Sequence, residues 1–115
     1  MKREALKRLL DALQAIRSIE AFTADQALAT FLENDLLQAA VERKFEIIGE
    51  ALKHAHAADP SVLELVPELP RVISTRNRII HIYEGVDHMI LWDAIQNELP
   101  SLKARLESVL GEDQP

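Results

Sequence analysis

Cysteine is absent from this chain of 115 residues, and glycine occurs only 3 times. Without cysteine the protein forms no disulfide, holds no thiolate-bound metal and has no cysteine nucleophile, which fits a reducing compartment such as the cytoplasm. Aromatic residues make up 4% of the sequence, although hydrophobic residues make up 48%. We therefore expect a single domain with a core of leucine, isoleucine, valine and alanine.

Long apolar runs are absent as well. No stretch approaches the roughly 18 apolar residues of a membrane-spanning helix, and the charged N-terminal segment lacks the apolar run of a signal peptide. We expect no membrane association and a cytoplasmic location. The formal net charge of −6 disfavours general coating of nucleic acid and DNA binding by this chain alone, because phosphate affinity comes mainly from clustered lysine and arginine.

Helical periodicity extends over almost the whole chain, whereas strand-like alternation is nearly absent. The spacing predicts helices over residues 2–21, 24–32, 36–57, 60–67, 70–84 and 88–110. Pro100 is expected to kink or split the last of these, and Gly111 to end it. The predicted fold is all-α, a single antiparallel bundle of four to six helices over residues 1–110 with a tail at 111–115.

Four helix starts are predicted from capping residues, one of them at Asp59, which is followed by a proline at the first helical position. Thr23 followed by Gln26 matches a capping box. Asp35 and Asp87 precede apolar-periodic segments, as N-caps do. Gly49 lies inside the long third segment, where a glycine costs about 1 kcal/mol relative to alanine. Either it permits the close approach of another helix, or it is a tolerated exception.

Residues 71–83 hold three arginines and no acid in an otherwise acidic chain. Arg76 carries a planar fork of donors that suits phosphate. His81 can transfer protons near neutral pH, and Asn77 precedes it by four residues, on the same face of a helix. A cation, a base and an orienting amide are what phosphodiester cleavage without a metal needs.

One regular helix does not aim all these groups at a single point. Arg76 and His81 are about 140° apart around an ideal helix, and His81 and Tyr83 are about 200° apart. Either the helix deforms before Gly85, or a second subunit completes the site. We favour a symmetric dimer, in which two such sets face each other and two histidines supply a base and an acid.

Each of these residues also has a plainer interpretation. His81 alone is more often a structural residue than a catalyst, and Arg76 alone is typically an ion-pair arginine whose partner is an acid of the long helix. Glu50 shares a helix face with Glu46, where carboxylates are usually solvated. It can instead brace Arg76 or His81. No spacing such as His-Glu-x-x-His is present, so we expect no metal site and no cofactor.

The motif resembles the Arg-x4-His-x-Tyr signature of HepT-like proteins, a branch of the HEPN superfamily. Its three positions are occupied by Arg76, His81 and Tyr83. Ile-Gly-Glu-Ala at residues 48–51 and Leu-Pro-Ser-Leu at residues 99–102 resemble two further segments of the family, in the expected order. Arg71 is a departure, because family members often have an aromatic residue at this position after the proline.

The resemblance implies a HEPN-like bundle that dimerises with the motif helices of both subunits facing each other. It implies the toxin of a toxin–antitoxin module of type II or VII, a metal-independent endoribonuclease paired with a nucleotidyltransferase antitoxin of the MNT type. In at least some pairs the antitoxin attaches AMP to the motif tyrosine, here Tyr83. The candidate catalytic residues are Arg76, Asn77 and His81. The candidate contacts to the RNA substrate are Arg71 and Arg78.

Two other functions remain open. The same cleft can bind a nucleotide, or dock the nucleotidyltransferase, without cleaving RNA. A purely structural helical adapter explains the bundle but not the basic segment. Cleavage that disappears in His81→Ala while the fold is unchanged separates the ribonuclease from both. Nucleotide binding, or AMP transfer to Tyr83, separates the binding module from the adapter.

Overall fold

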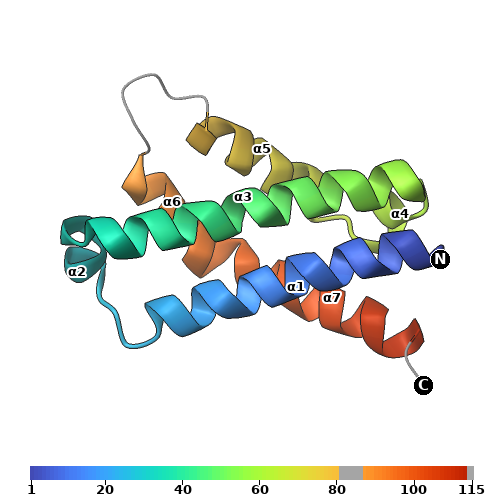
Figure 1. The fold of residues 1–115 in the computed structure, drawn as a ribbon, viewed down its shortest axis with the longest axis horizontal. Helices are drawn as coiled ribbons and strands as arrows, with labels where there is room; N and C mark the ends of the chain where they lie inside the picture. The colour runs from blue at the N-terminus through green and yellow to red at the C-terminus, as the bar shows by residue number, and fades with distance from the viewer. Residues whose placement is uncertain (81–86, 114–115) are drawn as a thin grey trace.

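The computed structural model of the protein describes residues 1–80 and 87–113, and within these ranges it contains helices and no strands (Figure 1). The described residues form seven helices: α1 (Arg3–Thr23), α2 (Leu28–Glu33), α3 (Asp35–Ala58), α4 (Val62–Leu65), α5 (Leu69–Ile80), α6 (His88–Asn97) and α7 (Leu99–Asp113). The all-α prediction is confirmed. The predictions on His81, Tyr83 and Gly85 lie outside the described residues.

Two long helices, α1 and α3, lie side by side and antiparallel, with α3 above α1 in Figure 1. Each turns a buried apolar stripe toward the core, with the helical spacing that the sequence predicted. The stripes include Leu9, Leu13, Ile16 and Ile19 on α1, and Val41, Phe45, Ile48 and Leu52 on α3. Because each such side chain contributes roughly 1.5–3 kcal/mol when it is removed from water, this pair supplies a large part of the core.

Three further helices, α5, α6 and α7, lie behind this pair in the same view (Figure 1). α5 contacts α3 and α6, α7 contacts α1 and α6, and the short α2 lies against α3 and α6. α5 is thereby held between the long α3 on one side and the region where α6 meets α7 on the other. In the described ranges, no helix combines the length and the apolar character needed to cross a membrane.

The capping box predicted at Thr23 is wrong. Thr23 is the last residue of α1, and its Oγ1 donates to the carbonyl oxygen of Ile19 at 2.8 Å. A hydroxyl that bonds back into the preceding turn is not available to cap the next helix. α2 accordingly begins later, at Leu28, and has only six residues.

The starts of α3 and α4 also differ from the prediction. Asn34 caps α3 in place of Asp35, because the Oδ1 of Asn34 accepts a hydrogen bond from the amide of Leu37 at 3.0 Å. The helix predicted for residues 60–67 is reduced to the single turn of α4. The carboxylate of Asp59 precedes that turn.

The C-terminal third of the chain follows the prediction in two respects and departs from it in a third. Asp87 caps α6, and its Oδ1 accepts hydrogen bonds from the amides of Met89 and Ile90 at 3.0 and 3.2 Å. The predicted last helix is split at Pro100, which lies in the first turn of α7. Amides of the first turn have no partner within the helix, so proline costs no hydrogen bond there. This split raises the number of helices from the six predicted segments to seven in the described ranges. Gly111 does not end α7, which continues through residue 113.

Candidate active site

The motif helix α5 is amphipathic. Pro70 occupies its first turn, where proline is well tolerated, and Val72 and Ile79 are buried in the core. Between these apolar positions, Thr75 faces the junction of α6 and α7, and Arg76 faces α3. The packing of α5 therefore fixes the directions of two adjacent polar side chains.

The side chain of Arg76 lies directly on α3 at Gly49. A Cβ atom at Gly49 would lie 2.7 Å from Cγ and 3.0 Å from Cδ of Arg76, which is closer than ordinary van der Waals contact. A larger residue therefore does not fit at Gly49 unless Arg76 moves. The side chain of Arg76 is only 13% exposed. Of the two interpretations of Gly49, the structure supports the close approach of another helix.

The guanidinium of Arg76 has two partners. Nη1 donates to Oδ1 of Asn77 at 3.0 Å, and Nη2 donates to Oε1 of Glu50 at 3.4 Å. The side chain of Glu50 is 57% exposed, so this ion pair contributes at most about 1 kcal/mol. Nε is buried and has no hydrogen-bond partner among the described residues. The fork is thus oriented on α3, and its acidic partner is open to exchange with another anion.

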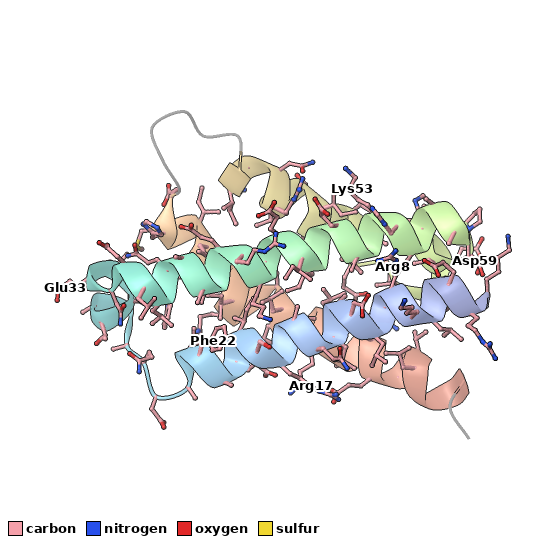
Figure 2. All side chains as sticks on the ribbon, in the orientation of Figure 1. Arg8, Arg17, Phe22, Glu33, Lys53 and Asp59 are labelled. Carbon is pink, nitrogen blue, oxygen red and sulfur yellow. The ribbon has the colours of Figure 1, made fainter. Side chains whose placement is uncertain are left out.

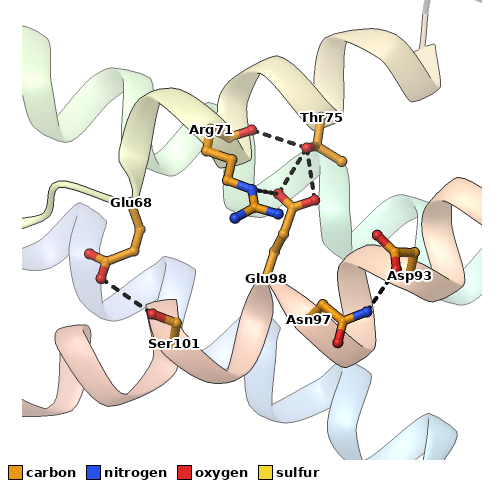
Figure 3. Close-up of polar contacts among 7 residues, drawn as sticks. All are labelled: Glu68, Arg71, Thr75, Asp93, Asn97, Glu98 and Ser101. Atoms are coloured by element: carbon orange, nitrogen blue, oxygen red, sulfur yellow. Dashed lines mark hydrogen bonds and ion pairs between the residues drawn. The ribbon is translucent and has the colours of Figure 1, made fainter.

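Arg71, a predicted RNA contact, points to a different neighbour. Its side chain is 71% exposed, and its Nε lies 3.8 Å from Oε1 of Glu98 (Figure 3). Glu98 is buried, and the Oγ1 of Thr75 lies 2.8 and 3.0 Å from its two carboxylate oxygens. The same hydroxyl lies 3.0 Å from the carbonyl oxygen of Arg71, so these acceptors share a single donor hydrogen. Arg71 therefore belongs to a separate polar cluster and does not contact Arg76.

The buried Glu98 and its partner Thr75 were missed by the sequence reasoning. Glu98 immediately precedes α7, and its carbonyl accepts from the amide of Leu102 at 3.3 Å. An acid at a helix N-terminus is favoured by the helix dipole, which is the signal that could have indicated it. Near the start of α5, Glu68 accepts from Oγ of Ser101 at 3.3 Å (Figure 3). Together these contacts hold the motif helix against the last two helices.

Arg78, the other predicted RNA contact, is exposed and lies with Asn77 along an open groove beside α5. The other described residues of this groove are His56, Leu63, Leu69, Pro70, Ile73 and Ser74. None of these described lining residues is acidic, so a phosphate near Arg78 meets no carboxylate there. This groove adjoins Arg76 through the hydrogen bond of Asn77.

A second groove lies between α1 and α3, where Arg8 is seen in Figure 2. Charges of both signs line it, and they include Lys44, Asp11 and Glu50. Arg8 is itself paired with Glu4 at 3.1 Å. This groove is therefore less suited to a polyanion than the one beside Asn77.

Of the predicted catalytic residues, the structure brings Arg76 and Asn77 into contact. His81 and Tyr83 lie beyond the last described residue of α5, so their predicted roles remain predictions. Within residues 1–80 and 87–113, no three histidine, aspartate or glutamate side chains lie close enough together to hold a metal ion.

Similarity to known proteins extends over most of the chain. The family model described as Ribonuclease HepT-like matches residues 12–109. A Thermococcus cleftensis protein, named a probable ribonuclease HepT, is 38% identical over 111 residues, which cover 95% of this chain and 98% of that protein. Two Methanocaldococcus jannaschii proteins, named as candidate RNases, are each 32% identical and cover 94% and 95% of this chain, with 98% and 93% of their own lengths matched. No solved structure is significantly similar to the chain.

Proposed function

This chain belongs to the HepT-like ribonuclease family, and from that premise we propose that it is an endoribonuclease that cleaves RNA without a metal ion. The observation that carries the proposal is the state of Arg76. This arginine is nearly buried, its fork is oriented by Asn77, and its acidic partner Glu50 is largely exposed. A guanidinium held in this way can bind a phosphate oxygen and stabilise the charge that develops during cleavage.

In the proposed reaction the 2′-hydroxyl of one nucleotide attacks the adjacent phosphorus. The bond from phosphorus to the 2′-oxygen forms, and the bond to the 5′-oxygen of the next nucleotide breaks. His81 removes the proton of the 2′-hydroxyl, and an acid returns a proton to the departing 5′-oxygen. Arg76 neutralises the phosphorane. Because Oδ1 of Asn77 accepts from Arg76, its Nδ2 can donate to the phosphate or to His81.

A second copy of the chain completes the site in this proposal. Arg76 and His81 are five residues apart, which does not aim both side chains at one phosphate on a regular helix. In a symmetric dimer the arginine of one subunit works with the histidine of the other, and the second histidine supplies the acid. Arg78 and Arg71 contribute positive charge along the path of the RNA.

The chain is further proposed to be the toxin of a toxin–antitoxin module. Its partner is a nucleotidyltransferase antitoxin of the MNT type, which attaches AMP to Tyr83. The modification has a direct physical effect, because AMP adds bulk and negative charge two residues from His81. RNA is then repelled and excluded from the cleft. Support for this proposal comes from the motif and the family.

The test is RNA cleavage in EDTA by the purified chain, after intact mass has shown that Tyr83 is unmodified. The parent should cleave, and His81→Ala and Arg76→Ala should not, with unchanged helical circular dichroism. Mixing the two inactive variants should restore part of the activity, because the mixed dimer contains one wild-type Arg76 and one wild-type His81 that meet across the subunits, with water replacing the missing second histidine as the acid. No restoration would place both groups of each site in one subunit.

Failure of the unmodified parent to cleave any RNA would overturn the ribonuclease proposal. The non-catalytic module that binds a nucleotide and docks the nucleotidyltransferase would then be favoured. AMP transfer to Tyr83 by the partner enzyme would support that alternative.

A further inference from the structure

Gly49 is the place where α3 comes closest to the motif arginine. The atoms of Arg76 that a Cβ at Gly49 would meet are Cγ at 2.7 Å, Cδ at 3.0 Å and Cβ at 3.2 Å. All three belong to the part of the side chain nearest its own backbone, so a change in the terminal torsions does not relieve the overlap. The bare backbone of α3 is therefore the surface on which Arg76 lies.

Glu50, the next residue along α3, meets the other end of the same side chain. Its Oε1 lies 3.4 Å from Nη2, while Asn77 accepts from Nη1 at 3.0 Å. Gly49 thus determines where the stem of Arg76 lies, and Glu50 and Asn77 determine how its fork is turned. Arginine has much rotamer freedom to lose, so a side chain ordered in advance loses less when a ligand arrives.

We propose that Gly49 and Glu50 are positioning residues for Arg76. Gly49 provides the space for its stem, and Glu50 holds Nη2 until a phosphate oxygen of the RNA takes its place. This inference rests on the proposed ribonuclease function. Exchange is feasible because Glu50 is 57% exposed and makes a single long contact, which is cheap to break. Neither residue touches the RNA in this scheme, so both act through Arg76.

A plainer explanation is that Gly49 merely allows two helices to pack. On that explanation, alanine at position 49 disturbs the packing whether or not Arg76 is present. If Gly49 instead makes room for one side chain, truncating that side chain should remove the penalty. The two explanations therefore differ in the coupling between Gly49 and Arg76, which is measurable without any RNA.

The first experiment is a thermal double-mutant cycle with Gly49→Ala and Arg76→Ala at one protein concentration. In the Arg76→Ala background, Gly49→Ala should raise the unfolding midpoint by about 4 °C, because alanine is the better helix former and the space is free. In the parent background the midpoint should not rise. Gly111→Ala is the matched control, since a Cβ at Gly111 meets nothing within 4 Å. Its shift should be the same in both backgrounds.

The second experiment measures cleavage by single variants with the wild-type Arg76. Gly49→Ala should lower kcat about 10-fold or more without loss of thermal stability, because small misplacements of a catalytic group are expensive. Glu50→Ala should lower kcat/KM about 3- to 10-fold, because Arg76 is then no longer ordered before the phosphate arrives. Glu50→Gln should recover most of the kcat/KM, because its amide oxygen still accepts from Nη2.

Glu46→Ala is the control for the acid, because Glu46 lies one turn earlier on α3 and pairs with Arg43 at 3.6 Å. It should leave kcat and KM unchanged. The inference would be overturned if Gly49→Ala shifted the unfolding midpoint equally in the parent and in Arg76→Ala. It would also be overturned if Gly49→Ala had the same kcat as the parent. A parent that cleaves no RNA would refute the proposed function instead, and the thermal cycle would still decide whether Gly49 makes room for Arg76.

Discussion

Two arginine–glutamate contacts involve the same motif helix, and the burial of their members is reversed. Where Arg76 meets Glu50, the arginine is 13% exposed and the acid 57%. Where Arg71 meets Glu98, the arginine is 71% exposed and the acid 7%. A buried carboxylate needs donors around it, and the hydroxyl of Thr75 can offer its one hydrogen to Glu98. A buried arginine with an exposed acid keeps donors that a ligand can take over.

The comparison teaches that an ion pair says little until the burial of each member is known. The contact of Arg71 with Glu98 joins α5 to the junction of α6 and α7, and its buried carboxylate is part of the packed interior. The contact of Arg76 with Glu50 leaves its acid in solvent, where an incoming phosphate can replace it. One contact thus has its carboxylate buried within the fold, and the other has its carboxylate in solvent.

The largest expected effect separates the two arginines by activity. Arg76→Ala should lower kcat/KM for RNA cleavage by about 100- to 1000-fold, the usual loss when a donor to the reacting group is removed. Arg76→Lys should recover little of it, because a lysine has no planar fork. Arg71→Ala should raise KM by no more than about 3-fold, since an exposed arginine adds only to the local positive potential. Cleavage of a fluorogenic RNA in EDTA measures all three.

Equal losses in Arg71→Ala and Arg76→Ala would remove the distinction between the two contacts. A restored rate in Arg76→Lys would show that charge alone suffices, and that the orientation of the fork by Asn77 has no catalytic value.

A smaller effect separates the two acids by stability. Glu98→Ala should lower the free energy of unfolding by about 1–3 kcal/mol, because it removes a buried side chain that links Thr75 of α5 to the start of α7 and leaves space there. Glu50→Ala should change it by less than about 1 kcal/mol, because an exposed pair contributes little. Urea unfolding followed by circular dichroism measures both. A larger loss in Glu50→Ala than in Glu98→Ala would reverse the assignment of structural and exchangeable acids.

The fold was largely predictable because apolar spacing on α1 and α3 is regular and the chain offers no competing strand pattern. The errors in the predicted helix starts occur where a short polar side chain has two possible hydrogen-bond partners nearby. Thr23 has a hydroxyl that can cap the next helix or bond back to Ile19, and only the structure shows the second choice. Asn34 and Asp35 are adjacent and both suit an N-cap, so the sequence could not decide between them.

The candidate site was predictable in part for a related reason. The contact of Arg76 with Glu50 joins residues 26 positions apart, and several acids on the long helix were equally plausible partners. Gly49 carried a signal, since glycine inside a helix needs an explanation, but the identity of the side chain above it depends on how α5 crosses α3. The cluster around Glu98 was missed because burial was predicted from repeating apolar positions, and a single buried acid adds nothing to such a repeat.

The smallest expected effect concerns a third carboxylate, that of Asp59. This residue directly follows α3 and lies near the surface, beside the start of α1 (Figure 2). Its oxygens accept from the amide of Lys2 at 2.9 Å and from the amide and hydroxyl of Ser61 at 3.1 and 2.8 Å. These hydrogen bonds, led by that of the Lys2 amide, lower the pKa of Asp59 from 3.8 to about 2.

Asp59 sharpens the comparison, because it shows that a carboxylate near the surface can be bound firmly when backbone amides donate to it. Since its pKa is lower in the folded state, its contribution to stability is present above pH 3.8 and is lost as the pH falls toward about 2. The unfolding midpoint of the parent should exceed that of Asp59→Asn at about pH 5, and the difference should shrink on acidification. An NMR titration of the Asp59 carboxyl near 3.8 would contradict this prediction.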